Sequence, residues 1–259
     1  MDAALTGTYA SILNEIRMRR EASAPVLKEV HYYSLNTAND GALGGVECPV
    51  CNNTGMVITK DGFVLHTREC DCMNLRRNKK RIRESGLSEL MENYTMSNYK
   101  VVDPWTKFAK QRAVDYINSK SGWFYIYGIT GSGKTHICTA ICSELMNKGK
   151  IVKYVIWSDL VQELRTVIND IGYDKIMRSL KEADVLYIDD FLKNNATEAD
   201  AKRAIEIINA RYNIPSKKTI ISSERPLEYV ANIDPAVMGR INERSRGFVL
   251  KTPNKNWRV

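Results

Sequence analysis

Two short motifs in this sequence combine residue types that bind phosphate groups and Mg²⁺. Residues 128–135 read GITGSGKT and fit the pattern G-x-x-x-x-G-K-[ST], a loop that wraps nucleotide phosphates. Its glycines let backbone N–H groups turn toward phosphate oxygens, Lys134 is expected to reach the β- and γ-phosphates, and the Thr135 hydroxyl is expected to bind Mg²⁺. The predicted nucleotide-binding residues are Gly128, Ile129, Thr130, Gly131, Ser132, Gly133, Lys134, Thr135 and His136.

The second motif is VLYIDD at residues 185–190. Its apolar run predicts a buried strand with Asp189 at the carboxyl end, where the carboxylate would hold Mg²⁺ through water. Asp190 would orient or deprotonate the attacking water; a surface Asp-Asp turn is the alternative. The chain between Lys134 and Asp189 has room for one extra helix–strand–helix, which suits ATP-hydrolysing machines better than small nucleotide kinases.

Four cysteines are spaced like the ligands of a structural metal. Cys48 and Cys51 form a C-x2-C pair, and Cys70 and Cys72 form a C-x-C pair. Between the pairs, GMVITKDGFVLHT reads as a β-hairpin, which would bring the four thiolates into the tetrahedron that Zn²⁺ prefers. Such a site would be structural, because four thiolates leave no position for water. Four unliganded thiols in a small module are the alternative.

These motifs need a scaffold, and the sequence from residue 103 onward supplies one. Short apolar runs alternate with helical patterns, which predicts an α/β fold, a P-loop ATPase core with a parallel sheet covered by helices on both faces. Ser158 is the expected N-cap of one helix. Strands are expected at 123–128, 150–157, 184–191 and 217–224, and helices at 104–120, 134–149, 158–168, 173–183, 198–213 and 234–246.

The N-terminal part of the chain has a different character. We expect residues 1–85 to form a domain that holds the zinc module, at about 45–75, and a basic helix. Residues 86–102 would be a linker and 103–259 the ATPase domain. The basic run RRNKKRIR at 76–83 reads either as a solvated helix face or as a nucleic-acid contact. The formal net charge of +8 favours polyanionic partners.

Composition excludes some classes of protein. Hydrophobic residues make up 44% of the chain and charged residues 26%, which is ordinary for a soluble globular protein. No run approaches the roughly 18 apolar residues of a membrane span, and the N-terminus lacks the pattern of a signal peptide. We therefore expect a cytoplasmic protein with no membrane partner.

The segments GITGSGKTH, VLYIDDF, TIISSERP and GRINER, preceded by a cysteine module and a Ser-Gly-Leu linker, resemble the DnaC/DnaI family of AAA+ helicase loaders. IstB-type transposition ATPases are close relatives of these loaders. The resemblance covers about residues 45–250, and the phage and Gram-positive branch is the nearer match. It implies the cofactors ATP, Mg²⁺ and Zn²⁺, and as partners a hexameric replicative helicase of the DnaB type and single-stranded DNA. It also implies self-association through the AAA+ domains on the helicase, in the cytoplasm of a bacterial or phage-infected cell.

The same resemblance implies roles for three further residues. The end of the strand TIISSE should be a sensor that faces the γ-phosphate and the attacking water. Ser223-Glu224 stands there in place of the Asn of many relatives, so we expect slow hydrolysis. GRINER resembles an arginine-finger segment that reaches a neighbouring subunit's ATP site. Arg240 and Arg244 lie one helical turn apart, and Arg240 fits the finger slightly better. A surface salt bridge is the alternative for either arginine.

Four functions compete on this sequence. The leading hypothesis is an ATP-dependent loader that delivers a replicative helicase onto single-stranded DNA during the initiation of replication. A transposition regulator that assembles on duplex DNA is the second, and the cysteine module argues against it. A small-molecule kinase would need an acceptor site and a lid that the sequence does not show. A zinc-bearing adaptor that uses ATP as a switch is the fourth, and the Ser-Glu sensor is compatible with it.

Overall fold

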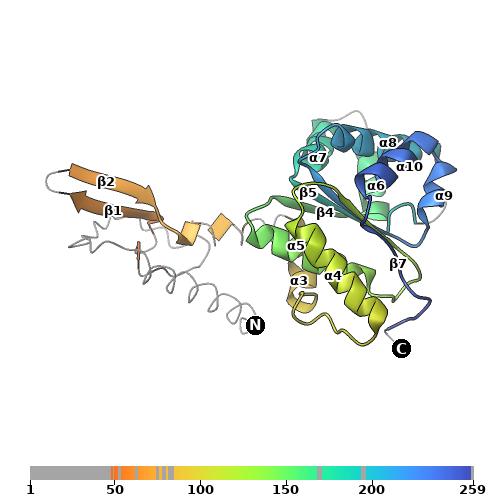
Figure 1. The fold of residues 1–259 in the computed structure, drawn as a ribbon. Helices are drawn as coiled ribbons and strands as arrows, with labels where there is room; N and C mark the ends of the chain where they lie inside the picture. The colour runs from red at the N-terminus through yellow and green to blue at the C-terminus, as the bar shows by residue number, and fades with distance from the viewer. Residues whose placement is uncertain are drawn as a thin grey trace. The chain divides into compact units, whose positions relative to one another are not determined.

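The computed structural model describes residues 48, 50–51, 54–61, 64–73, 76–77, 80, 85–167, 171–193 and 197–257. The chain divides into two compact units, Met1–Lys80 and Arg81–Val259 (Figure 1). Most of the first unit, including residues 1–47, lies outside the described part. This division does not test the predicted domain boundaries at 85 and 103, which stay predictions.

In the first unit the described core is a two-stranded hairpin. Strand β1 (Met56–Asp61) pairs antiparallel with β2 (Val64–Glu69), in a register that sets Met56 opposite Glu69 and Asp61 opposite Val64. This is the hairpin that the segment GMVITKDGFVLHT predicts, with Lys60 and Asp61 in β1. The hairpin ends bring the segments around Cys51 and Cys70 together, because the Cys70 N–H donates to the Gly55 carbonyl at 2.8 Å.

The second unit is built on a five-stranded parallel sheet with the strand order β4-β5-β6-β3-β7. Its strands are β3 (Trp123–Tyr127), β4 (Val152–Ile156), β5 (Val185–Asp189), β6 (Lys218–Ser223) and β7 (Val249–Lys251). The helices are α3 (Ser88–Asn93), α4 (Pro104–Asn118), α5 (Lys134–Asn147), α6 (Trp157–Thr166), α7 (Ile171–Glu182), α8 (Glu198–Tyr212), α9 (Leu227–Ala231) and α10 (Pro235–Arg244).

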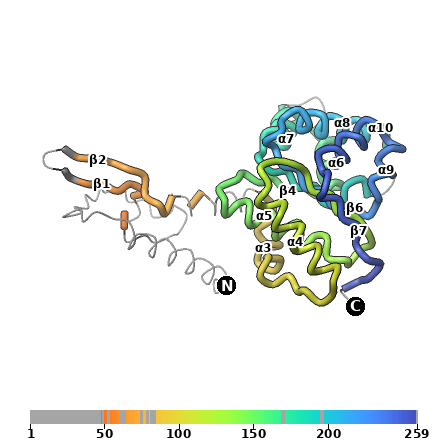
Figure 2. The backbone as a smooth tube through the Cα atoms, viewed as in Figure 1, coloured from red at the N-terminus to blue at the C-terminus, as the bar shows by residue number. Residues whose placement is uncertain are grey.

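Helices cover both faces of this sheet, as predicted. Successive residues of a strand point to opposite faces, and the two hydrophobic cores follow that alternation. In β3, Trp123 and Tyr125 belong to the core beneath α6 to α10, whereas Phe124 and Ile126 belong to the core beneath α3, α4 and α5. The tube in Figure 2 shows α3 and α4 beside α5 on one side of the sheet. Because all five strands are parallel, their carboxyl ends meet at one edge of the sheet, where a ligand site belongs.

The structure differs from the predicted elements in two places. Helix α6 begins at Trp157 with Ile156 as its N-cap, so Ser158 is not the cap, and its hydroxyl instead donates to Asp159 at 3.0 Å. Within segment 86–102, whose role as a linker stays a prediction, Leu87 is fully buried in the core with α5. Strand β7 and helix α9 were not predicted, because each is too short to show a period.

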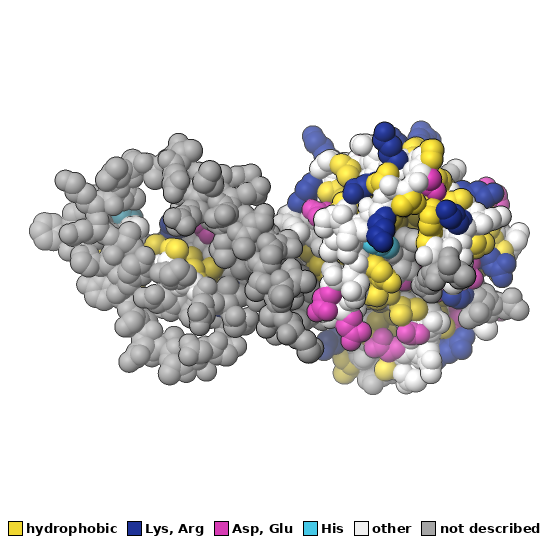
Figure 3. Space-filling model, turned by 90° about the horizontal axis from the view of Figure 1, so that it is seen from below, with side chains coloured by type: hydrophobic (Ala, Val, Ile, Leu, Met, Phe, Trp, Pro, Cys, Tyr) yellow, Lys and Arg dark blue, Asp and Glu magenta, His cyan; other side chains and the backbone are white. Residues whose placement is uncertain are grey.

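Two further observations concern the surface. No helix in the described part of the chain is both long enough and apolar enough to cross a bilayer. On the face of the second unit shown in Figure 3, Lys and Arg side chains are spread out and not gathered into one patch.

A single buried arginine ties α7, α8 and β6 together. Arg211, on α8, is fully buried and donates to the carbonyls of Leu180 (2.8 Å), Ala183 (3.0 Å) and Lys218 (2.6 Å). Burial lowers the pKa of Arg211 to about 10, so the guanidinium remains charged at neutral pH. These bonds fill carbonyls at the end of α7 that would otherwise be buried without a donor.

We predict that Arg211→Met lowers the free energy of unfolding by about 3 kcal/mol or more, because each buried carbonyl left without a donor costs about 1–3 kcal/mol. Denaturant unfolding of the full chain measures it. Arg246→Met is the matched control, since Arg246 is exposed and its loss should cost at most about 0.5 kcal/mol. Equal losses in the two variants would contradict this role.

Candidate functional site

The phosphate-loop motif occupies the junction between β3 and α5, as its chemistry requires. Gly133 is the N-cap of α5 in the left-handed conformation (φ 88°), and Lys134 is the first residue of the helix. The Lys134 ammonium donates to the carbonyls of Gly128 and Ile129 at 2.8 Å each. Desolvation lowers the pKa of Lys134, against the attraction of nearby carboxylates led by Asp190. The positive end of α5 and a lysine thus face the same place, which is what binds phosphate.

A distant segment lies against this loop. After β7, the Thr252 N–H donates to the Tyr127 carbonyl at 2.8 Å, and the Trp257 N–H donates to the Gly131 carbonyl at 2.9 Å. Gly131 has φ 77°, and a Cβ there would meet the end of the Asn256 side chain, which is exposed and can turn aside. Glycine is therefore favoured at 131 by the left-handed backbone conformation.

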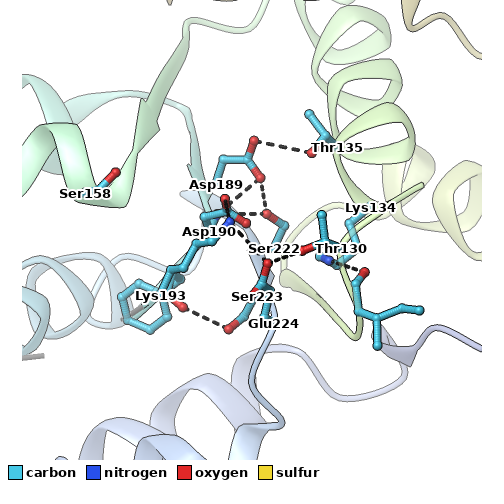
Figure 4. A network of polar contacts seen from close by, with 12 residues as sticks. Thr130, Lys134, Thr135, Ser158, Asp189, Asp190, Lys193, Ser222, Ser223 and Glu224 are labelled. Atoms are coloured by element: carbon cyan, nitrogen blue, oxygen red, sulfur yellow. Dashed lines mark hydrogen bonds and ion pairs between the residues drawn. The ribbon is translucent and has the colours of Figure 1, made fainter. Parts of the chain in front are cut away.

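Asp189 lies at the carboxyl end of β5 and collects donors from three neighbouring elements, and Figure 4 shows two of these donors, Ser222 and Thr135. It is 7% exposed, and its carboxylate accepts hydrogen bonds from Ser222, from the Tyr154 hydroxyl at 3.2 Å, and from Thr135 Oγ1 at 3.5 Å. Burial, followed by the charge of Asp189, raises the pKa of Tyr154, so this hydroxyl stays a donor at neutral pH. The oxygens of Thr135 and Asp189 converge, and such hard ligands fit Mg²⁺.

Asp190, the candidate water-orienting acid, is held by a lysine that the sequence analysis did not single out. Lys193 Nζ lies 2.8 Å from Asp190 Oδ2 and 3.1 Å from Glu224 Oε1. Glu224 in turn accepts a hydrogen bond from Thr130 of the phosphate loop. The ends of β5 and β6 and the loop are therefore joined by one chain of polar contacts.

The Ser223 hydroxyl, to which the resemblance gives the sensor role, is bonded away from Asp189, and that role stays a prediction. This hydroxyl is buried, donates to the Phe191 carbonyl at 2.8 Å and accepts the Arg225 N–H at 3.0 Å. Ser222 is the serine at Asp189, and it also accepts the Asp190 N–H at 3.1 Å. The reason is strand alternation, because a shift of one residue along β6 moves a side chain to the other face.

The phosphate loop and the ends of β5 and β6 border one cavity of about 320 Å³. Its polar part is Thr130, Gly131, Gly133, Lys134, Thr135, Asp190, Lys193 and Glu224, and its aromatic part is Tyr94, His136 and Trp257. The rings of Tyr94 and His136 stack with centroids 4.9 Å apart. His136 Nε2 lies 3.1 Å from the Thr95 carbonyl and 3.0 Å from Asn98 Oδ1, and desolvation lowers its pKa. A cavity lined by both charged and aromatic side chains suits a nucleotide.

Ser132 has a supporting place within the predicted loop. It is 1% exposed, and its hydroxyl donates to the Ile129 carbonyl at 2.7 Å, which holds the curl of the loop.

The two candidate finger arginines share one aromatic neighbour. Arg240 and Arg244, on α10, lie 5.7 and 5.8 Å from the centroid of the Tyr212 ring, so both are on one helix face, as their spacing predicts. Arg244 also donates to the Ile214 carbonyl at 3.2 Å. Among the described residues, the Tyr212 ring is the only neighbour that we find for the Arg240 guanidinium. Neither arginine lines the cavity of its own subunit.

The four predicted metal ligands form a cluster in the first unit. Their sulfur atoms all lie within 4.8 Å of one another, and the Cys48–Cys70 and Cys51–Cys72 pairs are 3.8 and 3.5 Å apart. Four sulfurs at about 2.3 Å from a tetrahedral Zn²⁺ would be about 3.8 Å apart. The Gly55 N–H also donates to the Cys51 sulfur at 3.4 Å, which favours a thiolate. The donor set therefore fits zinc in number, type and spacing.

Part of the predicted basic run can be placed. Arg77 forms an ion pair with Glu69 of β2, and Arg76 is 6% exposed. Residues 78–79 and 81–84 lie outside the described residues, so the choice between a helix face and a nucleic-acid contact stays open.

We predict that Ser222→Ala weakens Mg²⁺-dependent nucleotide binding, because the carboxylate of Asp189 loses its closest donor. Ser223→Ala is the matched control, since it removes a bond to a backbone carbonyl on the other side of β6. It should change stability by about 1 kcal/mol and nucleotide affinity little. Affinity with and without Mg²⁺, beside denaturant unfolding, separates the two effects. A loss of Mg²⁺-dependent affinity in Ser223→Ala alone would restore the sequence-based assignment.

Known proteins resemble this chain along most of its length. The family model described as IstB-like ATP binding protein matches residues 52–239. The phage-like element PBSX protein XkdC of Bacillus subtilis is 26% identical over 94% of this chain and 92% of its own. The replicative helicase loader DnaC of Escherichia coli is 27% identical over 67% of this chain and 68% of its own. The solved structure of the DnaC helicase loader has a TM-score of 0.57 at 20% identity, covering 64% of this chain and 99% of that one.

Coverage differs among the relatives. The chain spans 63% of the length of YqaM from Bacillus subtilis and 49% of a solved DNA replication initiation factor. The likeness to the DnaC structure supports the AAA+ P-loop fold. The sequence matches confirm the resemblance to DnaC/DnaI helicase loaders that the motifs indicate. Since the family model covers more than half of the residues, the chain belongs to the family of IstB-like ATP-binding proteins.

Proposed function

We propose that this protein is an ATP-dependent loader that delivers a hexameric replicative helicase of the DnaB type onto single-stranded DNA during the initiation of replication, in the bacterial or phage-infected cytoplasm. One observation carries the proposal: the nucleotide cavity of an IstB-like ATPase and a four-cysteine cluster occur in the same chain. Similarity to a protein named replicative helicase loader supports it. In this proposal the first unit binds the helicase, and the second binds ATP and DNA.

The cavity provides for ATP as follows. Backbone N–H groups of the loop and Lys134 would bind the β- and γ-phosphates, and the aromatic residues of the cavity would be available to stack on the base. Mg²⁺, held through Thr135 and Asp189, would neutralise the phosphate oxygens when bound. Asp190 would then accept a hydrogen bond from the attacking water, and the buried Ser222 keeps the neighbouring Asp189 in place.

Hydrolysis is proposed to depend on assembly. An arginine supplied by a neighbouring subunit can be worth about 10³-fold or more in rate. Arg240 is the better candidate because its guanidinium is committed to one aromatic contact, whereas Arg244 also bonds the Ile214 carbonyl. Subunits aligned on a helicase would place α10 of one against the ATP of the next. A free subunit would then hydrolyse ATP slowly.

A second candidate is a regulator of transposition that assembles on duplex DNA. The match to the IstB-like family model favours it. Against it stands the cysteine cluster, which suits a module for a protein partner. Which nucleic acid and which protein stimulate the ATPase therefore decides between the two functions.

We predict one tightly bound zinc per chain. Elemental analysis of the purified protein should find it, and Cys48→Ser/Cys51→Ser should lose it, because two of the four sulfur ligands are removed. Cys138→Ala/Cys142→Ala is the control: both thiols are buried in the second unit, and the zinc should stay. Zinc retained in the first variant would show that the ligand set is different.

We also predict that ATP hydrolysis by the wild-type protein rises when a DnaB-type helicase or single-stranded DNA is added. Arg240→Ala should abolish the rise and leave ATP affinity nearly unchanged, because the finger acts only across an interface. Arg244→Ala should be milder, and Lys134→Ala should remove nucleotide binding. An ATPase titration with each partner measures these effects. A wild-type protein that neither partner stimulates would refute the loader, and stimulation by duplex DNA alone would favour the transposition regulator.

A further inference from the structure

The segment that follows β5 has an unusual backbone. Asp190 and Leu192 both have positive φ, 53° and 56°, a conformation that residues with a side chain adopt only at an energetic cost. The Lys193 N–H closes the turn on the Asp190 carbonyl at 3.0 Å. Phe191 is fully buried between the two strained residues, and its N–H donates to the Ser222 carbonyl at 2.8 Å. The turn is thus held by its surroundings in a shape that sends Lys193 back toward Asp190.

The ammonium of Lys193 occupies a central place among the polar groups of the cavity. It is 2.8 Å from Asp190 and 3.1 Å from Glu224, and Glu224 accepts from Thr130 of the phosphate loop. The three ion-pair side chains are each only about a third exposed. Figure 4 shows this chain of contacts running from the end of β5 to the loop. The ammonium therefore takes one of the acceptor positions of the Asp190 carboxylate and holds its charge.

Electrostatic attraction decides which acceptor the Lys193 ammonium binds. Two cations, Lys134 and Lys193, face three carboxylates, those of Asp189, Asp190 and Glu224, at this end of the site. The hydrogen bond to Asp190 raises the pKa of Lys193, which stays protonated at neutral pH. A terminal phosphate has three acceptor oxygens and carries more negative charge than one carboxylate. It therefore competes well for a protonated lysine. A diphosphate lacks the group that would reach beyond Lys134.

We propose that Lys193 is a positioning residue that recognises the terminal phosphate of a nucleoside triphosphate and, in moving to it, releases Asp190. Without that phosphate, Lys193 keeps the acid bound and the site idle. The step is a transfer of one ammonium between oxygen acceptors, with no covalent change. The inference rests on the proposed binding of ATP and goes beyond it, because it assigns the distinction between triphosphate and diphosphate to one side chain.

The test is equilibrium binding of ADP and of a non-hydrolysable ATP analogue, with Mg²⁺, to the full chain. Lys193→Met should weaken binding of the analogue by about tenfold, the size of one charge-assisted hydrogen bond, and change ADP affinity less than about twofold. Lys193→Arg should keep most of the preference for triphosphate. Lys202→Met is the matched control, a lysine of the same chemistry that is 74% exposed and paired with Glu198, and it should behave like the wild type.

A double-mutant cycle separates this role from a general effect of charge. Asp190→Asn removes the competing negative charge and leaves a weaker, neutral acceptor, so it should raise the affinity for the analogue relative to ADP. That gain should disappear when Lys193→Met is added. Equal changes for both nucleotides in Lys193→Met, or a gain from Asp190→Asn that survives without Lys193, would overturn the inference and leave the nucleotide site intact. A wild-type protein that binds neither nucleotide would overturn the proposed function and, with it, this inference.

Discussion

A carboxylate buried at the end of a strand must be compensated by hydrogen-bond donors, and the arrangement around Asp189 follows from that requirement. Its donors come from β4, β6 and α5, through Tyr154, Ser222 and Thr135. Because the strands are parallel and in fixed register, β4, β5 and β6 end at the same edge of the sheet, where α5 begins. The phosphate loop, the acidic turn after β5 and the end of β6 are thereby held within one cavity.

The features that the sequence predicted are those with a local signature. The phosphate loop is recognised because glycine, lysine and threonine each have a defined task at a fixed spacing. The alternation of apolar runs and helical patterns predicts the parallel sheet, since a strand buried on both faces is apolar throughout. The cysteine cluster is also predicted from local spacing, because a hairpin between two cysteine pairs brings the four sulfurs together and leaves few other arrangements.

The features that were missed depend on contacts between distant residues or on a single dihedral angle. Ser222 and Ser223 are the same residue type, and only the register of β6 decides which of them faces Asp189. Lys193 reaches Asp190 because Asp190 and Leu192 adopt left-handed conformations. The sequence contains no glycine there that would indicate such a turn. Tyr94 and Trp257 line one cavity with the phosphate loop, although they lie far from it in sequence.

The strand order also governs when, during synthesis, the nucleotide cavity can form. Strand β3, almost entirely buried, is made first among the strands of its sheet, yet its two neighbours are β6 and β7, which leave the ribosome last. Until then, an apolar strand reading WFYIY has no partner on either side. Such a segment invites association with other chains, and non-local pairing of this kind slows folding. The strand order therefore leaves the centre of the sheet without its neighbours until the last part of the chain has been made.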